Sequence, residues 1–288
     1  MPIITHDTPI SPAYISLLSS DYTMLNNTIG SYMSFELYKP IIIDSNVETW
    51  LKIESFKFTN SMYNVSIYSN IFYFGLAASS YAVQSVVITR SNYDITSLLV
   101  ALNNIGNGFV FVYDSKTMKI TISNSQNFYL YNSTYNMLKI LGFTNKVQIS
   151  ASNALTSTNI INLIGSQMLY LSLPNLSLNS YGVKNSANKA SKSNVASIPV
   201  ISIQGDTQTY VSDLMHKIND KIITFIEVRI VDENGNEVNF NGVDWFLNVS
   251  FIFSYKKESR KPTYLTDVQA APDNVEDNID TNIDTNIG

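Results

Sequence analysis

Histidine is the side chain that most often moves protons near neutral pH, and this chain has two histidines. His6 lies near the N-terminus, and His216 lies in a short segment beside Asp213 and Lys217. A catalytic triad would need a serine presented by a Gly-x-Ser-x-Gly turn, which the sequence does not contain. We therefore interpret His216 as a histidine on the surface of a helix rather than as a catalytic base.

Two further groups of residues have part of the spacing of a ligand site. Asp232, Asn234 and Asn236 are spaced as in a calcium-binding loop, but the glycine is displaced and the closing glutamate is missing. A hairpin turn accounts for this run better. Gly106 and Gly108 lack the Lys-Ser/Thr pair of a phosphate-binding loop and precede a strand, so we expect them to end a helix.

Charge gives no indication of a nucleic-acid site. The net charge is −5 and the pI is near 5.0. The basic cluster Lys256, Lys257, Arg260 and Lys261 could contact nucleic acid or an acidic neighbour, but beside an acidic stretch a solvated linker is the simpler interpretation. The chain has no cysteine, which excludes thiol catalysis, thiolate metal sites and disulfides. We therefore expect no catalytic, cofactor-binding or metal-binding residue, and no enzyme.

The composition favours a large core and a neutral surface. Of the 288 residues, 45% are hydrophobic, which is enough to bury a core without disulfides or metal. Only 14% are charged, compared with about 25% in typical soluble domains. The chain has 18 Tyr and 14 Phe, and aromatic residues are enriched where proteins bury surface against one another. This surface favours assembly, although an AT-rich genome would also enrich Asn, Ile, Tyr and Lys.

The sequence shows no sign of secretion or of membrane insertion. The first twenty residues lack the basic start and apolar run of a signal peptide, and no later window offers eighteen consecutive apolar residues. We expect a protein that is made and used in soluble form. The Asn-x-Ser/Thr sequons are then expected to be chance occurrences, and they begin at Asn26, Asn64, Asn132, Asn175 and Asn248.

Alternation of apolar and polar residues predicts strands along most of the chain. The pattern is found at residues 33–37, 51–58, 63–74, 82–89, 169–173, 222–231 and 245–255. A change of phase at Ser55 predicts a β-bulge. The segment from Asp114 to Thr117 predicts the turn of a hairpin between 109–113 and 118–122. The turn signal at 232–235 predicts a second hairpin that joins the last two strands, and alternation around Trp245 favours a core position over a sugar-stacking platform.

Few helices are expected. Asp94 can cap a helix with one apolar face, followed by Gly106, and that face consists of Ile95, Leu98, Leu99, Leu102 and Ile105. A second short helix is expected from Ser133 to Leu141, ended by Gly142. Ser11 and Pro12 could start a short helix before Ala13, within a polar, Pro-interrupted N-terminal arm.

Two polar segments are expected to be exposed. Residues 177–197 have the composition of a long loop, either mobile or ordered against a neighbour. From Asp267 onward the chain carries only acidic charge and repeats Asn-Ile-Asp-Thr, which predicts a disordered acidic tail.

Several blocks between about Ser31 and Tyr255 together carry a resemblance to a known family. They are residues 35–43; 50–64 with Ser61-Met62-Tyr63-Asn64-Val65-Ser66; 88–102 with Asn92-Tyr93-Asp94-Ile95; Leu138 to Phe143; and 226–255 with Val228-Arg229-Ile230-Val231-Asp232-Glu233-Asn234-Gly235, Val238-Asn239-Phe240-Asn241-Gly242 and Trp245. In this order the blocks resemble the penton, or minor capsid protein, of virophages and of the related Polinton-like and adenovirus-like double-stranded DNA viruses. The 177–197 loop and the acidic tail have no match in the resemblance.

The resemblance implies an all-β fold, a single jelly-roll sandwich of two antiparallel sheets with two short helices. We accordingly expect an N-terminal arm (1–30), a jelly-roll domain (31–255) with its long loop at about 177–197, and a flexible tail (256–288). Antiparallel strands with one apolar face must bury that face against a second sheet, and a jelly roll does so with eight strands.

The resemblance also implies a structural protein of the virion, with no catalytic residue and no cofactor. It would form homopentamers at the fivefold vertices of an icosahedral capsid, beside trimers of a double-jelly-roll major capsid protein. An internal cement protein and a jelly-roll receptor or glycan-binding module are the alternatives. A fivefold ring in negative-stain images would favour the vertex, whereas sugar binding through a surface aromatic residue would favour the glycan-binding module.

Overall fold

The structure is a computed structural model, and it describes residues 11–21, 23–24, 31–133, 135–144, 148–178 and 194–256. Much of the expected N-terminal arm, most of the 177–197 loop and nearly all of the 256–288 tail lie outside these residues. The division into arm, jelly-roll domain and tail therefore stays a prediction.

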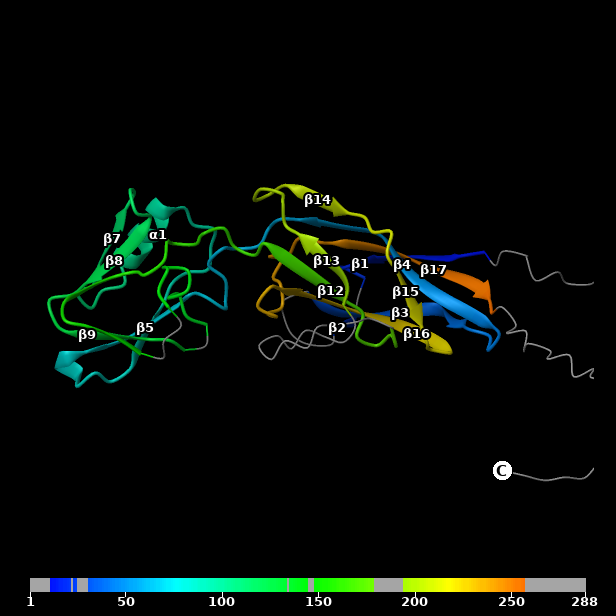
Figure 1. Cartoon of the computed structure of the whole chain (residues 1–288), viewed down its shortest axis with the longest axis horizontal. Helices are drawn as coiled ribbons and strands as arrows, with labels where there is room; N and C mark the ends of the chain where they lie inside the picture. Colours follow the sequence, from blue (N-terminus) through cyan, green and yellow to red (C-terminus); the bar gives the residue numbers. More distant parts are fainter. Residues whose placement is uncertain are drawn as a thin grey trace, which may run out of the picture. The chain divides into compact units, whose positions relative to one another are not determined.

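Two antiparallel sheets pack face to face around a hydrophobic core (Figure 1). The first, which we call the β4 sheet, has the order β1-β17-β4-β14, with β15 also paired to β4; its strands are β1 (Ala13–Leu18), β4 (Val47–Thr59), β14 (Thr207–Tyr210), β15 (Met215–Ile218) and β17 (Phe246–Tyr255). The second, the β16 sheet, has the order β13-β12-β16-β3-β2; its strands are β2 (Thr23–Met24), β3 (Tyr32–Ile42), β12 (Met168–Ser172), β13 (Asn194–Pro199) and β16 (Ile222–Asp232).

The chain passes between the two sheets in jelly-roll order. It runs from β1 to β3, back to β4, across to β12 and β13, back to β14 and β15, and then to β16 and β17. The last two strands enter the middle of the sheets, β16 between β3 and β12 and β17 between β1 and β4. Such interleaved Greek keys define the jelly roll, so the expected all-β fold class is confirmed.

The core of the sandwich follows the alternation seen in the sequence. Leu51 and Ile53 of β4 are fully buried, as are Phe56 and Phe58 after the change of phase. In the pairing of β4 with β17, Asn248 faces Ser55 and Val249 faces Ile53, so one residue of β4 is left over, as in a bulge. The predicted β-bulge is confirmed.

Trp245 lies at the centre of this core. Its side chain is 1% exposed, and its ring centroid lies 5.9 Å from that of Phe56 and 6.0 Å from that of Phe35, which belongs to the other sheet. Trp245 is therefore a core residue and not a sugar-stacking platform.

The segment between β4 and β12, residues 60–167, folds around a second hydrophobic core, and we call it the insertion. Its strands pair as β10-β9-β5-β6 and β11-β8-β7. Its elements are β5 (Ile71–Leu76), a 3-10 turn η1 (Ala77–Ser79), β6 (Gln84–Val87), α1 (Ile95–Asn103), β7 (Val110–Asp114), β8 (Lys119–Ser123), β9 (Phe128–Tyr131), β10 (Gln148–Ala151) and β11 (Ala154–Thr156). Five phenylalanine rings contact one another at its centre: Phe72, Phe74, Phe109, Phe111 and Phe128.

The helix and the first hairpin form as predicted. Asp94 caps α1, since its Oδ1 accepts a 2.7 Å hydrogen bond from the backbone N–H of Ser97, and this bond lowers the pKa of Asp94. Leu98 and Leu102 are the fully buried residues of the helix. Strands β7 and β8 pair across the turn at Asp114.

Two expected helices are wrong. The segment after Pro12 is strand β1, which pairs with β17 from Ala13 to Leu18. Its Tyr14 faces out while Leu17 is buried, so the partner strand and the core outweigh the helix-start signal at Pro12. The segment 133–141 forms turns instead of a helix, because the backbone N–H of Met137 bonds to the carbonyl of Ile71.

Two strand predictions are also corrected. The strand expected over 63–74 begins only at Ile71, after an irregular segment. The turn at 232–235 is present, but β16 and β17 do not pair as a hairpin, because they belong to different sheets. The physical reason is that consecutive strands of a sandwich can belong to opposite sheets. The chain therefore passes from one sheet to the other between β16 and β17.

Candidate functional site

The residues considered for a catalytic triad each interact with a different partner. His216 lies on strand β15 and not on a helix, and its Nε2 lies 2.9 Å from the backbone carbonyl oxygen of Val195. Lys217 forms an ion pair with Glu48 at 2.6 Å. Asp213 lies 3.4 Å from the ammonium of Lys52, whose pKa is raised by hydrogen bonds to Asp213 and Glu54. These residues therefore hold strands together, and His6 lies outside the described residues.

The calcium-like run is a turn closed by hydrogen bonds. Oδ1 of Asp232 accepts from the backbone N–H groups of Asn234 and Asn236, both at 2.8 Å, and Oδ2 accepts from the Asn236 side chain at 3.1 Å. Gly235 supplies the left-handed backbone at φ +79°. N–H donors thus occupy both carboxylate oxygens, and in the described part of the chain no group of three His, Cys, Asp or Glu side chains is placed to hold a metal ion.

The two glycines after α1 do not themselves end the helix, which stops at Asn103 with Asn104 as its C-cap. Gly106 and Gly108, with φ values of +79° and +72°, lie in the turn that leads from the helix to β7. Of the basic cluster at the start of the tail, only Lys256 is described.

One edge of the β4 sheet presents exposed aromatic side chains. Strand β1 forms this edge, with Tyr14 71% exposed. Phe246 on the neighbouring strand β17 is 45% exposed and pairs with Leu18. We call Tyr14, Leu18 and Phe246 the β1 edge.

The opposite edge of the same sheet presents exposed aliphatic side chains. Strands β14 and β15 form it, each pairing with part of β4. The exposed residues lie on the loop before β14, on the loop after it and at the start of β15, and we call them the β14 edge: Ile201, Ile203, Val211, Leu214 and Met215. Each of these side chains is at least 52% exposed.

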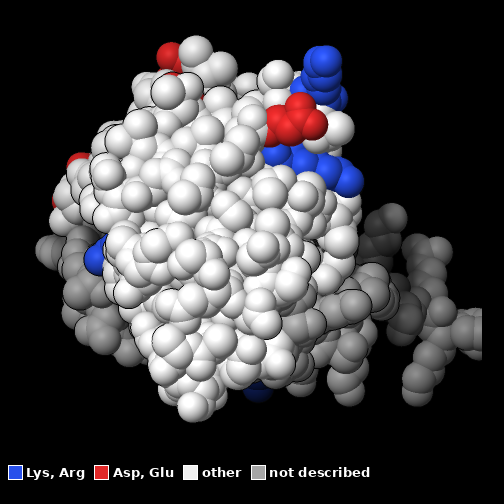
Figure 2. Space-filling model, turned by 90° about the vertical axis from the view of Figure 1, so that its left-hand side faces the viewer, with Lys and Arg blue, Asp and Glu red and all other residues white. Residues whose placement is uncertain are grey.

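The insertion carries few charges. Its charged residues are Arg90, Asp94, Asp114, Lys116, Lys119, Lys139 and Lys146. Figure 2, which views the molecule from the side where Figure 1 labels β7, β8 and β9, shows a broad face nearly free of acidic and basic residues. Exposed Val110 and Val112 lie on the outer side of β7.

A polar cleft lies between the insertion and the turn that follows β16. Its volume is about 190 Å³. The insertion supplies residues from 63–69, 136–140 and 162–166, and the turn supplies Asp232, Glu233, Asn234 and Asn236. We call it the 63/234 cleft.

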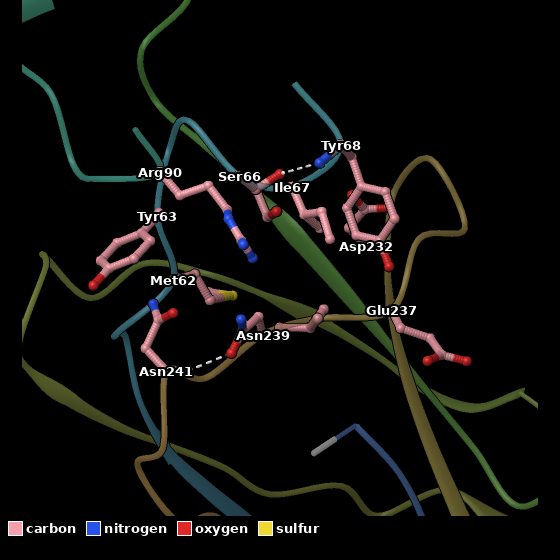
Figure 3. A pocket seen from close by; sticks show the side chains of 12 residues that line it. Met62, Tyr63, Ser66, Ile67, Tyr68, Arg90, Asp232, Glu237, Asn239 and Asn241 are labelled. Atoms are coloured by element: carbon pink, nitrogen blue, oxygen red, sulfur yellow. Dashed lines mark hydrogen bonds between the residues drawn. The ribbon is translucent and has the colours of Figure 1, made fainter. Parts of the chain in front are cut away.

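A smaller hollow of about 40 Å³ adjoins this cleft and shares Tyr63, Ser66 and Tyr68 with it. In Figure 3 the Arg90 side chain extends into the hollow toward Met62 and Asn239. Glu237 lies on the far side of this hollow.

Tyr68 contributes a partly buried aromatic ring to the cleft. Its ring lies 5.5 Å from that of Tyr135, centroid to centroid. Burial raises the pKa of Tyr68, and the nearby charge of Glu237 raises that pKa further. The phenol is therefore neutral at physiological pH and can both donate and accept a hydrogen bond.

No helix among the described residues has the length and apolarity needed to cross a bilayer.

Comparison with known proteins finds similarity to solved structures but to no family model and no curated sequence. A crystal structure of the mavirus penton protein is 9% identical and covers 85% of this chain and 100% of its own, with a TM-score of 0.44. A cryo-EM structure of the Sputnik virophage is 13% identical and covers 84% of this chain and 97% of its own, with a TM-score of 0.38. One neighbour is thus a penton protein, and the other belongs to a virophage particle.

Proposed function

We propose that the chain is a structural viral capsid protein, which associates with copies of itself and with other capsid subunits in the virion. The observation that carries the proposal is the pair of exposed apolar edges on one sheet of the jelly roll. The β1 edge and the β14 edge lie on opposite margins of the β4 sheet and differ in composition. Exposed apolar clusters of this kind mark sites of protein association. The sequence blocks that resemble virophage pentons point to the same role.

The finer proposal is a homopentamer at a fivefold vertex, beside trimers of a double-jelly-roll major capsid protein. A ring is built from heterologous contacts, in which one patch of a subunit meets a different patch of the next. The two edges supply two such patches. Only 14% of the residues are charged, so identical neighbours meet with little like-charge repulsion. The proposal assigns no catalytic residue and no cofactor.

The first experiment measures the size and symmetry of the purified protein. Light scattering coupled to size-exclusion chromatography should give the mass of five copies of the 32.2 kDa chain. Negative-stain images should show fivefold rings. A protein that stays monomeric both alone and with the major capsid protein would contradict the capsid role. Monomers that bind major-capsid trimers without forming rings would instead favour the internal cement role.

A second experiment tests the two edges by charge exchange. Val211→Glu with Leu214→Glu on the β14 edge should abolish the ring, and so should Tyr14→Lys with Phe246→Lys on the β1 edge. A chain that carries all four substitutions should recover the ring at low salt, because each acidic edge then meets a basic edge, and should lose it again at high salt. Val87→Glu is the matched control, since Val87 is 66% exposed and lies on neither edge.

A further inference from the structure

We propose that the 63/234 cleft binds one neutral sugar unit. This would be an activity separate from assembly, because none of the residues that line the cleft belongs to the β1 edge or to the β14 edge.

The size of the cleft fits a single small polyhydroxylated ring. Its volume of about 190 Å³ lies below the range of about 300–1,000 Å³ that is usual for pockets of drug-sized ligands, which favours a ligand no larger than one sugar ring. A drug-sized apolar molecule fits poorly, because such molecules usually need pockets of about 300 Å³ or more with a mainly apolar lining.

The polar groups that line the cleft have unused capacity. Asn234 accepts from Lys139 through Oδ1 at 2.7 Å, and Asn162 accepts from the backbone of Ile164 through Oδ1 at 3.1 Å. The amide hydrogens of both asparagines have no partner among the described residues. The hydroxyl of Ser166 has none there either. Sugar hydroxyls both accept and donate, so they match such a mixed set of groups.

The charges of the cleft select against strongly charged ligands. Lys139 and, in the adjoining hollow, Arg90 would repel cations, while Glu233 and Asp232 would repel anions. The exposed ring of Tyr63, 39% accessible, offers an apolar face beside these groups. A neutral sugar, with hydroxyls on its edge and C–H groups on its face, satisfies both kinds of surface.

The test is saturation-transfer NMR on the full-length protein with D-glucose, D-galactose, D-mannose and N-acetyl-D-glucosamine, and with N-acetylneuraminic acid as the anionic probe. At least one neutral sugar should bind, and the anionic sugar should not. The double variant Asn162→Ala with Asn234→Ala should weaken binding at least about tenfold, because two hydrogen-bonding side chains are lost. Asn46→Ala, which removes an exposed asparagine from a distant turn, should leave binding unchanged.

Ser166→Ala provides a second variant, because it removes only one hydroxyl from the lining of the cleft, and it should also weaken binding. The proposal is overturned if no neutral sugar binds at about 10 mM, tenfold above a Kd of 1 mM. It is equally overturned if the folded variants bind as tightly as the wild type, or if the anionic sugar binds best. Light scattering on the same samples reports assembly independently, so failure of the sugar site and failure of the capsid role are distinguishable.

Discussion

At the scale of single residues, asparagine side chains complete the hydrogen bonding of irregular backbone. The Asn64 amide donates to the carbonyls of Tyr93 at 2.7 Å and Leu163 at 2.9 Å, and its oxygen accepts from the N–H of Tyr93. Asn175 makes the same kind of paired contact with Phe225 and Glu227. The high asparagine content therefore has a structural use, and a glycan on either sequon would have to displace these bonds.

Gly142 is a position where only glycine fits. Its φ is +82°, and an added Cβ would lie 2.3 Å from the carbonyl oxygen of Asn159 and 2.7 Å from that of Ile160. Gly142→Ala should destabilise the protein by about 2–5 kcal/mol, since left-handed backbone costs about 1–2 kcal/mol and steric overlap adds about 1–3 kcal/mol. Urea unfolding measures the loss.

The control for Gly142→Ala is Gly106→Ala. Gly106 has a similar φ of +79°, but no atom lies within 4 Å of the position that an added Cβ would take. Only the backbone cost of about 1–2 kcal/mol should then appear. Equal losses for the two variants would show that the close approach at Gly142 does not matter.

At the scale of elements, one side chain fastens helix α1 to strand β7. The Asn103 amide donates to the carbonyl of Leu99 within the helix at 3.0 Å and to that of Phe111 on β7 at 3.1 Å. Its oxygen accepts from the N–H of Phe111 at 2.8 Å. The helix is thus held both by its buried leucines and by a polar clamp at its C-terminal end.

We expect Asn103→Ala to destabilise the protein by about 2 kcal/mol, because hydrogen bonds worth about 1 kcal/mol each are lost and the Phe111 groups lose their partner. Hydrogen exchange should rise in α1 and β7. The neighbouring substitution Asn104→Ala is the control and should change stability by no more than about 0.5 kcal/mol. If both variants behaved alike, the clamp would have no energetic role.

At the scale of the whole molecule, the described chain has two hydrophobic cores with no buried residue in common. The jelly-roll core contains Leu51 and the insertion core contains Leu102, both fully buried. Either leucine replaced by alanine should cost about 2–5 kcal/mol in its own core.

The two cores should respond separately to these substitutions. Leu102→Ala should raise hydrogen exchange in residues 71–156 and leave the sandwich strands protected, whereas Leu51→Ala should do the reverse. Ring formation should survive Leu102→Ala, because both apolar edges belong to the jelly roll. Exchange that rises equally throughout the chain in both variants would show a single cooperative unit instead.

Much of the local structure could be predicted from the sequence. Alternation identified β4, β12, β16 and β17 and their buried residues, and the change of phase at Ser55 identified the bulge, because in a strand side chains alternate between the two faces. Capping chemistry identified α1 through Asp94. The jelly roll itself was an expectation from resemblance, because alternation says which face of a strand is buried but not which sheet covers it.

Tertiary structure decided the rest. Residues 13–18 became a strand because β17 offers them a partner, and residues 133–141 did not become a helix because their backbone bonds to β5. The sequence did not show that the apolar residues form two separate cores, because the strand residues of both cores follow the same alternating pattern. The two apolar edges and the 63/234 cleft join segments far apart in the sequence, and only the pairing of strands across the folded molecule brings those segments together.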